Sequence, residues 1–419
     1  MVLVSHPTGN ANVRQALLAL HENGLLAEFW TTLCWDSRSS LNLVLPNMLR
    51  AELSRRSYPQ VPPPLVHTQP WREAGRLLAM RAGIERLIFR NESYLSVANV
   101  CSALDRTVAN RLRRVDVKAV YAYEDGALDT FRTARQKGIF TFYELPIAYW
   151  KSIHELLEEE AELCPGWAAT MPSARDSAEK TDRKDAELEL SDLIFVPSRY
   201  VMDSLPRHLR QSGRVWICSY GAPPVPSAIR RIRSAKLRVL YVGGLSQRKG
   251  LAYLVRALKN MDSLLEVTMI GRRVGNCAEL DAALAQYRYI PAMPHAQVLA
   301  EMERHDVLVL PTLAEGLALV VLEAMSRGMA VVTTPNSGSV EIIRDGLDGF
   351  IVPIRSSSAL AEKLELLAGD RELLAAVQER ARKRAQEYNW ERYRMALASA
   401  VEDVLREGDV KAGKVAGCA

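Results

Sequence analysis

The pattern of apolar and polar positions changes its period repeatedly along the chain. Short apolar runs such as VLVS (2–5) and AVYAY (119–123) precede longer stretches with apolar residues three or four apart, such as NVRQALLALHENG (12–24). The alternation stops near residue 222 and begins again with LRVLYVGG (237–244). Apolar runs separated by amphipathic helices are typical of βαβ units, in which helices cover both faces of a parallel sheet. The pattern therefore predicts two α/β domains, each with a parallel sheet.

The segment between the two series marks the boundary. Residues 219–236, SYGAPPVPSAIRRIRSAK, hold three prolines followed by a basic run, as is common in linkers. We place one domain at 1–222 and a second at 223–390. Two doubly wound sheets in one chain form a cleft lined by the C-terminal ends of their strands, where open α/β sheets bind ligands. The polar segment 164–185 interrupts the first series, and we expect a long loop there.

Length and composition agree with two soluble domains. The chain has 419 residues, of which 48% are hydrophobic and 25% charged, and one core rarely organises that length. Its six cysteines form no C-x-x-C pair, which argues against a zinc ribbon or a redox motif. The sequence has no basic leader and no run of about 18 apolar residues. We therefore expect a cytoplasmic protein, attached at most to the inner face of a membrane.

The formal net charge of +5 is small but unevenly distributed. Residues 50–114 carry twelve Arg or Lys against five Asp or Glu, a local excess of +7. Such a stretch suits an anionic membrane surface, and it suits a solvated helical surface equally well. It lacks the interleaved aromatic residues and the motifs of a nucleic-acid binder, so we expect no nucleic-acid partner.

Candidate chemistry lies in AEGLALVVLEAM (314–325). DVLVLPT (306–312) has the composition of a buried strand, and the segment after it has that of a helix. Glu315 then lies in the loop before the helix, and Glu323 roughly 10 Å along the axis at about 1.5 Å per residue. Glycine at such a junction leaves backbone N–H groups and the positive end of the helix dipole open to a phosphate. A purely structural alternative has Glu315 capping the helix and Glu323 pairing with Arg327.

A second strand-turn-helix junction, VGGLSQRKG (242–250), places Arg248 and Lys249 at a helix entrance. Positive charge is unfavourable at that end of the helix dipole unless an anion neutralises it. The spacing matches neither the P-loop nor the G-x-G-x-x-G fingerprint. The junction therefore predicts an anion site of another type.

Together these features resemble the retaining GT-B glycosyltransferases of family 4. The resemblance covers residues 237–353 and is carried by three motifs. They are a glycine turn ending in Lys249 and Gly250, the E-x7-E pair of Glu315 and Glu323, and the run EAMSRGMAVVTTPNSGSVEIIRDGLDGFIVP that begins at the second glutamate.

Weaker similarity to the same family extends to residues 191–223 and 5–14, whereas 30–115 and 150–185 match no family pattern. The resemblance implies an α/β protein of the GT-B type, with two Rossmann-like, doubly wound parallel-sheet domains facing a central cleft. It also implies that a C-terminal helix, at 391–410, packs back on the first domain.

The resemblance assigns roles at the matching positions. Lys249, with Arg248, would stabilise the leaving diphosphate as negative charge develops on it. Glu315 would bind hydroxyls of the donor sugar, and Glu323 the ribose diol of the nucleotide. The catalytic set is thus Arg248, Lys249 and Glu315. The donor-binding set comprises Gly243, Gly244, Ile290 beside the base, Gly316 and Leu317 on the distal phosphate, Ala318 and Glu323.

The family transfers sugars without a dedicated metal, and this chain has no Asp-x-Asp motif. We therefore expect a UDP- or GDP-linked sugar as donor, with no metal and no other cofactor. We also expect attack on one face of the sugar without a glycosyl-enzyme, so that Glu315 is no nucleophile, unlike the paired carboxylates of retaining glycosidases. Two positions depart from the common pattern: Gly244 stands where many members have arginine, and Ala318 where many have glycine.

The acceptor side is the less similar part of the chain. Relatives often place a histidine after the strand IFTFYELP (139–146), where this chain has Tyr143 and Glu144. Loops after two other strands of the first series add polar residues at the same rim. The predicted acceptor-side set is His6, Gly9, Asn10, Glu124, Tyr143 and Glu144.

These features favour a retaining hexosyltransferase that moves a sugar from a nucleotide sugar to a hydroxyl acceptor, a saccharide or glycolipid in polysaccharide or glycoconjugate biosynthesis. Nucleotide binding is expected to draw the two domains together. An epimerase or a phosphorylase on the same fold is an alternative enzyme. The alternative from another class is a catalytically silent membrane-surface assembly protein that keeps the nucleotide pocket, with residues 50–114 as its working surface.

Overall fold

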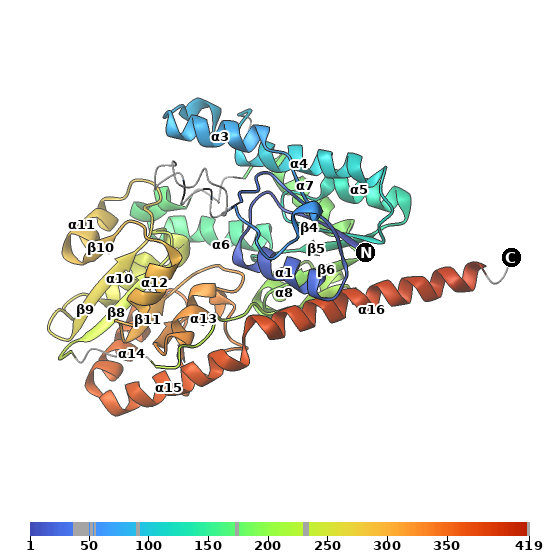
Figure 1. Cartoon of the computed structure of the whole chain (residues 1–419). Helices are drawn as coiled ribbons and strands as arrows, with labels where there is room; N and C mark the ends of the chain where they lie inside the picture. Colours follow the sequence, from blue (N-terminus) through green and yellow to red (C-terminus); the bar gives the residue numbers. More distant parts are fainter. Residues whose placement is uncertain are drawn as a thin grey trace.

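The computed structural model describes residues 1–36, 50, 53, 56–88, 93–171, 176–228 and 234–416. The chain folds around two parallel sheets, each flanked by helices (Figure 1). This architecture confirms the predicted fold of two α/β parallel-sheet domains. No helix within the described ranges is long and apolar enough to cross a lipid bilayer.

The first sheet has the strand order β3-β2-β1-β4-β5-β6-β7, and every neighbouring pair is parallel. Its strands are β1 (Val2–Ser5), β2 (Leu26–Thr31), β3 (Val66–Thr68), β4 (Ala119–Tyr123), β5 (Phe140–Glu144), β6 (Leu193–Val196) and β7 (Val215–Ile217). Alternate residues of a strand enter different cores: Val2 and Val4 pack in one hydrophobic cluster and Leu3 in another. Burial on both faces explains why these strands are continuous apolar runs.

Helices cover both faces of this sheet. They are α1 (Ala11–Glu22), α3 (Trp71–Arg81), α4 (Val97–Leu112), α5 (Leu128–Lys137), α6 (Trp150–Leu163), α7 (Ala178–Glu189), α8 (Arg199–Ser204) and α9 (Arg207–Arg210), with the 3₁₀ turns η2 (Pro63–Leu65), η3 (Glu85–Leu87) and η4 (Pro165–Thr170). Figure 1 shows α4 and α5 on one side of the sheet, α1 on the other, and α3 outermost beyond α4.

The second sheet has the order β10-β9-β8-β11-β12-β13, again all parallel. Its strands are β8 (Leu237–Val242), β9 (Leu265–Ile270), β10 (Arg288–Ile290), β11 (Val307–Leu310), β12 (Ala330–Thr333) and β13 (Phe350–Ile351). Its helices are α10 (Leu251–Ala257), α11 (Ala278–Gln286), α12 (His295–Met302), α13 (Leu319–Ser326), α14 (Ser357–Gly369) and α15 (Arg371–Glu387), with the 3₁₀ turns η6 (Gln247–Lys249) and η7 (Pro335–Ser337). The strand order reverses between β8 and β11, and such a switch point opens a crevice at the C-terminal ends of the strands.

Residues 164–185 are not the predicted long loop, although 172–175 lie outside the described part. The 3₁₀ turn η4 follows Cys164 directly, and α7 begins at Ala178. Cys164 and Trp167 are buried in the same hydrophobic cluster as the strands of the second sheet. Contacts with a distant part of the chain therefore order a segment whose local polarity is typical of a loop.

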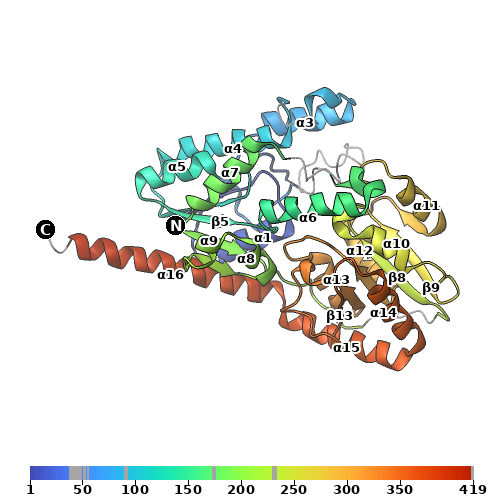
Figure 2. The ribbon, with the colours of Figure 1, turned by 180° about the vertical axis from the view of Figure 1, so that it is seen from behind.

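Helix α6 attaches this segment to the second half of the chain. Its Glu160 is fully buried. The carboxylate accepts hydrogen bonds from Gln247 Nε2 at 2.6 Å, from the Tyr253 hydroxyl at 2.9 Å and from Arg355 Nε at 2.8 Å. Figure 2 shows α6 lying between the two halves.

The last helix, α16 (Trp390–Ala416), follows α15 and packs along α1 of the first half (Figure 1). Arg394 on α16 pairs with Glu22 at 3.0 Å and donates to the Gln15 side chain at 2.8 Å. The chain thus crosses between its two halves near Ala222 and again at the start of α16. The domain limits at 1–222 and 223–390 stay a prediction.

Candidate functional site

The loops after β8 and β11 form the base of the candidate site, because these strands are neighbours in the second sheet. The β8 loop bends at Gly243, whose φ of 154° lies in the region that favours glycine. Gly271 crosses it so closely that a Cβ on Gly271 would lie 1.7 Å from the Gly243 carbonyl oxygen. The carbonyl of Gly244 accepts a hydrogen bond from the Tyr241 hydroxyl at 2.9 Å. The two predicted donor glycines therefore form a tightly constrained bend.

Arg248 and Lys249 lie on η6, between that bend and α10. Gly250 ends the turn with a φ of 73°, and a Cβ there would lie 1.9 Å from the carbonyl oxygen of Pro311, just after β11. The backbone carbonyl of Arg248 accepts a hydrogen bond from the Leu313 amide at 2.8 Å. The turn is thus fixed against the end of β11, and both cationic side chains start from the edge of the sheet.

Glu315 joins the two cations. Its Oε1 accepts a hydrogen bond from Arg248 Nη1 at 2.7 Å and also contacts Lys249 Nζ. The same Arg248 nitrogen donates to the Ala314 carbonyl at 2.6 Å. Burial raises the pKa of Glu315, but the charges of Lys249 and Arg248 outweigh burial and hold this pKa below its usual value. Glu315 is therefore an anion, and it supplies the negative charge that the sequence requires at this helix entrance.

Glu315 does not cap the following helix, so the structural alternative for this residue is wrong. Helix α13 begins at Leu319, and its N-cap residue, Ala318, makes no side-chain capping bond. The amide of Glu315 donates to the Asn336 carbonyl at 3.1 Å, and the amide of Ala318 donates to the Ser337 carbonyl at 3.0 Å. The loop 315–318 is anchored at both ends, and the Ala318 amide is already engaged within the chain.

The first half of the chain closes over this loop. Ser198 Oγ, at the start of α8, donates to the Gly316 carbonyl at 2.6 Å. A Cβ on Gly316 would lie 1.8 Å from the carbonyl oxygen of Pro146, which follows β5. Tyr200 lies close enough to Glu315 that burial and this charge raise the pKa of its hydroxyl to about 12. The predicted donor loop is therefore walled in by both halves.

Two further predicted donor residues flank the same loops. Leu317 is buried directly before α13, with 5% of its surface exposed. Ile290 ends β10, and its carbonyl accepts a hydrogen bond from the Gly271 amide at 3.0 Å. Because Gly271 crosses Gly243 so closely, this bond links the backbone of Ile290 to the glycine bend.

Glu323, on α13, pairs with a residue that the sequence does not indicate. Its Oε1 lies 2.8 Å from Nε2 of His295, the first residue of α12. The hydrogen bond from His295 to Glu323 raises the pKa of the histidine. The predicted structural partner, Arg327, lies instead 3.4 Å from Glu303, so the alternative pair within the helix is wrong. No sequence spacing reveals a contact between two helices that follow different strands.

On the first sheet, the loop after β1 brings His6, Gly9 and Asn10 to the C-terminal edge. Burial lowers the pKa of His6 to about 3, so its ring is neutral at physiological pH. Its Nδ1 accepts a hydrogen bond from the Thr8 amide at 3.0 Å, which leaves the proton on Nε2. A Cβ on Gly9 would lie 2.4 Å from the ring of Tyr58. Asn10 is exposed before α1 and makes no side-chain capping bond, so its amide is accessible.

Tyr143 and Glu144 are core residues, which corrects their assignment to the acceptor side. Strand β5 extends through Glu144, so the two side chains alternate into opposite cores and do not enter the loop. Tyr143 is fully buried and its hydroxyl donates to Glu187 at 3.3 Å. Glu144 accepts hydrogen bonds from the hydroxyls of Tyr121 and Tyr220, both at 2.7 Å, and burial raises its pKa.

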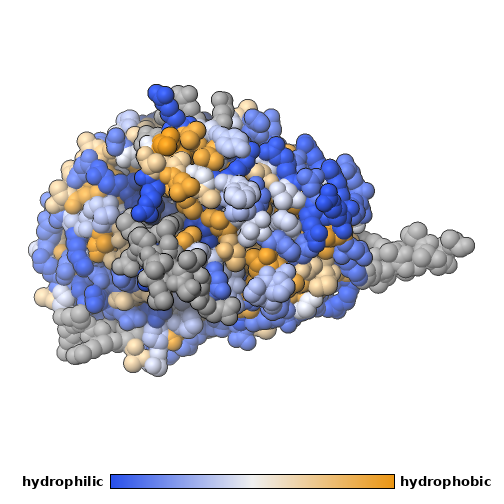
Figure 3. Space-filling model, turned by 45° about the horizontal axis from the view of Figure 1, so that its top comes forward, coloured by the Kyte–Doolittle hydropathy of each residue, from blue (hydrophilic) through white to orange (hydrophobic). Residues whose placement is uncertain are grey.

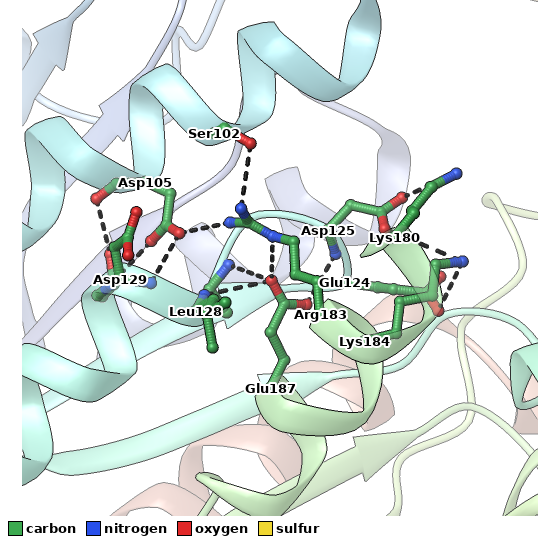
Figure 4. Close-up of polar contacts among 12 residues, drawn as sticks. Ser102, Asp105, Glu124, Asp125, Leu128, Asp129, Lys180, Arg183, Lys184 and Glu187 are labelled. Atoms are coloured by element: carbon green, nitrogen blue, oxygen red, sulfur yellow. Dashed lines mark hydrogen bonds and ion pairs between the residues drawn. The ribbon is translucent and has the colours of Figure 1, made fainter. Parts of the chain in front are cut away.

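Glu124 belongs to a cluster of charges at the end of β4 (Figure 4). Its carboxylate lies 3.2 Å from Lys184 Nζ, and Asp176 lies 3.5 Å from the same nitrogen. Asp125 follows with a φ of 71° and lies 3.7 Å from Lys180 Nζ. Both lysines come from α7, in the segment predicted as a loop, so their role was missed. Their spacing of four residues would have indicated a common helix face.

Other charges in Figure 4 stabilise the start of α5. Glu187 accepts hydrogen bonds from the amides of Ala127 at 2.9 Å and Leu128 at 3.2 Å. Arg183 lies 3.1 Å from Glu187 and 2.5 Å from Asp105. Burial raises the pKa of Glu187 to about 7. Carboxylates that bind the free amides of a helix N-terminus are structural caps, so we assign no ligand to this part of the cluster.

Residues 227–384 match the family model described as glycosyl transferases group 1. The match contains the glycine bend, both cations and both glutamates. The second half of the chain is therefore similar to the glycosyl transferases group 1 family. Every predicted donor-side residue lies inside the matched stretch, whereas the predicted acceptor side and the segment 50–114 lie outside it.

Curated relatives match part of the chain. A glycosyltransferase named for colanic acid biosynthesis, WcaL of Salmonella typhimurium, is 29% identical over 217 residues, which cover 44% of this chain and 53% of that protein. The amylovoran biosynthesis glycosyltransferase AmsK of Erwinia amylovora is 29% identical over 158 residues, which cover 34% of this chain and 38% of that protein. The chain thus spans about half the length of the curated relatives it matches, or less.

Solved structures resemble nearly the whole chain. The sucrose-phosphate synthase of Thermosynechococcus elongatus has a TM-score of 0.63 at 17% identity, with 97% of this chain and 98% of that chain covered. HepE of Anabaena, solved in complex with UDP-glucose, has a TM-score of 0.61 at 14% identity, with 96% and 99% covered. At these identities the likeness establishes the fold, and it extends the GT-B arrangement to both halves.

The positive charge at the candidate site comes from Arg248 and Lys249. No group of three or more His, Cys, Asp or Glu side chains is placed to hold a metal ion in the part of the chain that the structure describes. Two cations at the C-terminal edge of a parallel sheet can bind an anion of comparable charge, such as a diphosphate. The diphosphate would contact these cations beside Glu315 or replace Glu315 as their partner.

Proposed function

We propose that this chain is a retaining hexosyltransferase that moves a sugar from a UDP- or GDP-linked donor to a hydroxyl acceptor. The observation that carries the proposal is the meeting of Arg248, Lys249 and Glu315 at the ends of β8 and β11. Two cations against one carboxylate leave net positive charge in a site walled by both halves. A diphosphate leaving group has the charge and the hydrogen-bond acceptors to bind there.

The proposed chemistry follows from this charge balance. As the bond between the anomeric carbon and the diphosphate breaks, negative charge develops on the leaving oxygen, and Arg248 and Lys249 stabilise it. Burial lowers the pKa of Lys249, which indicates a poorly solvated ammonium, and poorly solvated charges interact more strongly. Glu315 then binds hydroxyls of the donor sugar, and Glu323 binds the ribose diol. The acceptor hydroxyl attacks from the face that the diphosphate leaves and gives its proton to the departing phosphate oxygen, so the anomeric configuration is retained without a metal.

The relatives support a setting in polysaccharide or glycoconjugate assembly. WcaL and AmsK carry names of colanic acid and amylovoran biosynthesis, and HepE was solved with UDP-glucose. For this chain we propose a saccharide or lipid-linked acceptor, bound at the edge of the first sheet where His6, Asn10 and Glu124 lie. We place the enzyme in the cytoplasm, at the inner face of a membrane.

A panel of UDP- and GDP-sugars, followed by thermal melting and product analysis of the full chain, tests the proposal. We expect one nucleotide to raise the melting temperature, and its sugar to be transferred or slowly hydrolysed with an unchanged anomeric configuration by NMR. Lys249→Ala should keep its fold and lose most turnover.

Other outcomes of the panel identify the alternatives. Product formed only with added phosphate would indicate a phosphorylase, and an altered sugar still joined to its nucleotide would indicate an epimerase. Nucleotide binding without turnover of any donor would indicate the silent assembly protein.

A further inference from the structure

Exposed apolar side chains are concentrated on one face of the first half. Of the fifteen large hydrophobic side chains that are exposed in the described ranges, seven lie between residues 71 and 97. They lie on α3, η3, the start of α4 and the connections between these elements, and we call this surface the α3 face: Trp71, Leu78, Met80, Ile84, Leu87, Tyr94 and Val97. Figure 3, with this side of the molecule turned forward, shows apolar and polar side chains interleaved there.

Helix α3 is inverted relative to an ordinary surface helix. Trp71 and Leu78, seven residues apart on one stripe, are 81% and 69% exposed. The inward position is taken by Glu73, which is 2% exposed and lies 2.6 Å from both Arg56 and Arg76. A helix that turns a buried ion-pair network inward and its largest apolar side chains outward marks an interaction surface.

The rim of the α3 face is basic. Arg81 and Arg86 are exposed beside the apolar residues. Arg72 stacks over the ring of Tyr94 at 4.3 Å, and its Nη1 donates to the carbonyl of the same residue at 3.2 Å. Apolar anchors, interfacial Trp and Tyr, and arginines that reach phosphate groups are the chemistry that binds an anionic lipid surface. Part of the basic stretch predicted at 50–114 lies outside the described residues, namely 51–52, 54–55 and 89–92.

We propose that the α3 face docks the protein on an anionic lipid bilayer. A cavity of about 300 Å³ lies beside this face. Two exposed members of the face, Met80 and Val97, line it, and so do Asp125 and Lys180 at the end of β4. The cavity therefore joins the apolar face to the polar edge of the first sheet. This placement rests on the proposed function: the head of a lipid-linked acceptor would pass from the bilayer through the cavity to the strand ends.

Vesicle flotation of the full chain tests the proposal, with phosphatidylcholine alone and with an equal mixture of phosphatidylcholine and phosphatidylglycerol. We expect binding to the anionic vesicles only, weakening as salt is raised. Leu78→Glu should lower vesicle affinity at least tenfold, and Arg81→Gln and Arg86→Gln about fivefold each, because each basic residue contributes separately near an anionic surface. Met395→Glu is the matched control, since Met395 on α16 is 61% exposed and lies outside the α3 face.

The readout is independent of sugar transfer. Each variant is also melted with and without UDP, and a retained UDP shift shows that the fold and the nucleotide site are intact. Absence of vesicle binding by the wild type with a normal UDP shift overturns the docking proposal alone. Vesicle binding by a wild type whose melting temperature no nucleotide raises would support docking and contradict the proposed function. An equal loss of vesicle affinity in Met395→Glu would overturn the lipid assignment. A concentration-dependent dimer in sedimentation that Leu78→Glu abolishes would also overturn it, and would show that the α3 face binds another copy of the chain.

Discussion

Replacing Glu315 with glutamine should separate nucleotide binding from sugar transfer. The change removes a negative charge, at nearly constant shape, from a carboxylate that contacts both Arg248 and Lys249. We expect UDP to bind more tightly to Glu315→Gln than to the wild type, because the diphosphate no longer shares the cations with a like charge. Sugar transfer should be largely lost, since the donor hydroxyls lose an ionised acceptor.

The magnitude follows from the contacts. Both cations touch the same carboxylate oxygen, so a diphosphate oxygen bound to either cation would lie about 5 Å from Glu315. Two like charges at that distance repel by about 3 kcal/mol at an effective dielectric constant of about 20. The substitution also has an entropic cost, because Glu315 orients the two cations: each side chain that it no longer holds loses about 1 kcal/mol of conformational entropy when UDP orders it again. Arg248 keeps its bond to the Ala314 carbonyl, so only Lys249 is freed. The balance, about 2 kcal/mol, corresponds to roughly thirtyfold tighter UDP binding.

Calorimetric titration with UDP measures this difference directly. Without nucleotide, Glu315→Gln should melt below the wild type because two partly buried cations lose the carboxylate that neutralises them, and saturating UDP should close the gap. Asp203→Asn is the control, since its carboxylate pairs with Arg199 at 3.4 Å where the two side chains are 53% and 63% exposed. Equal or weaker UDP binding to Glu315→Gln would refute the reasoning, because the carboxylate would then organise the cations and not compete with the diphosphate.

Three further substitutions test other contacts. Glu160→Gln removes the charge of a fully buried carboxylate bonded to Arg355. Urea unfolding should therefore show a free energy of unfolding lower by about 3 kcal/mol. A decrease below about 1 kcal/mol, typical of an exposed ion pair, would contradict the anchoring role of Glu160. Gly316→Ala places a methyl group against the Pro146 carbonyl of the first half. It should reduce turnover at least about tenfold with little change in UDP affinity. Full turnover would show that the loop can shift. Because Glu323 raises the pKa of His295, their pair stabilises the fold fully below about pH 6.5 and loses that contribution as the pH rises through the raised pKa. The pair is partly exposed, so His295→Gln should cost at most about 1 kcal/mol at low pH, and its melting temperature should converge with that of the wild type at high pH; a gap independent of pH would contradict this.

The donor half could be predicted from sequence because its signals are local. Buried parallel strands are continuous apolar runs, and the glycines at 243 and 250 stand where the backbone needs a positive φ or a close approach. Two cations at a helix entrance predict a diphosphate there, and this binding stays a prediction. Glu315 supplies negative charge beside these cations, through a contact that neither motif contains alone, because it joins the loops of two neighbouring strands.

The acceptor half could not be predicted to the same depth, because its decisive contacts are long-range. Whether Tyr143 enters a core or a loop depends on where β5 ends, and an apolar run does not fix its end within two residues. Lys180 and Lys184 were hidden in a polar stretch that forms α7, a helix capped by Ser177 whose Leu188 packs in the core of the first half. The same limit applies to α3, whose periodicity indicates an amphipathic helix but not which side faces water.

The contacts between the halves constrain how a donor enters the site. By sequence α6 belongs to the first half, but its Glu160 is bonded to Arg355 of the second. Separating these groups would leave buried charges unpaired at a cost of several kcal/mol, whereas the bond from Ser198 to the Gly316 carbonyl is a neutral hydrogen bond of about 1 kcal/mol. Of these two contacts the bond at Ser198 costs less to break, so we expect the halves to open there, with α6 staying on the second half. We therefore expect closure on a bound nucleotide to act through the β5–α6 loop, whose Pro146 leaves no room for a side chain at Gly316.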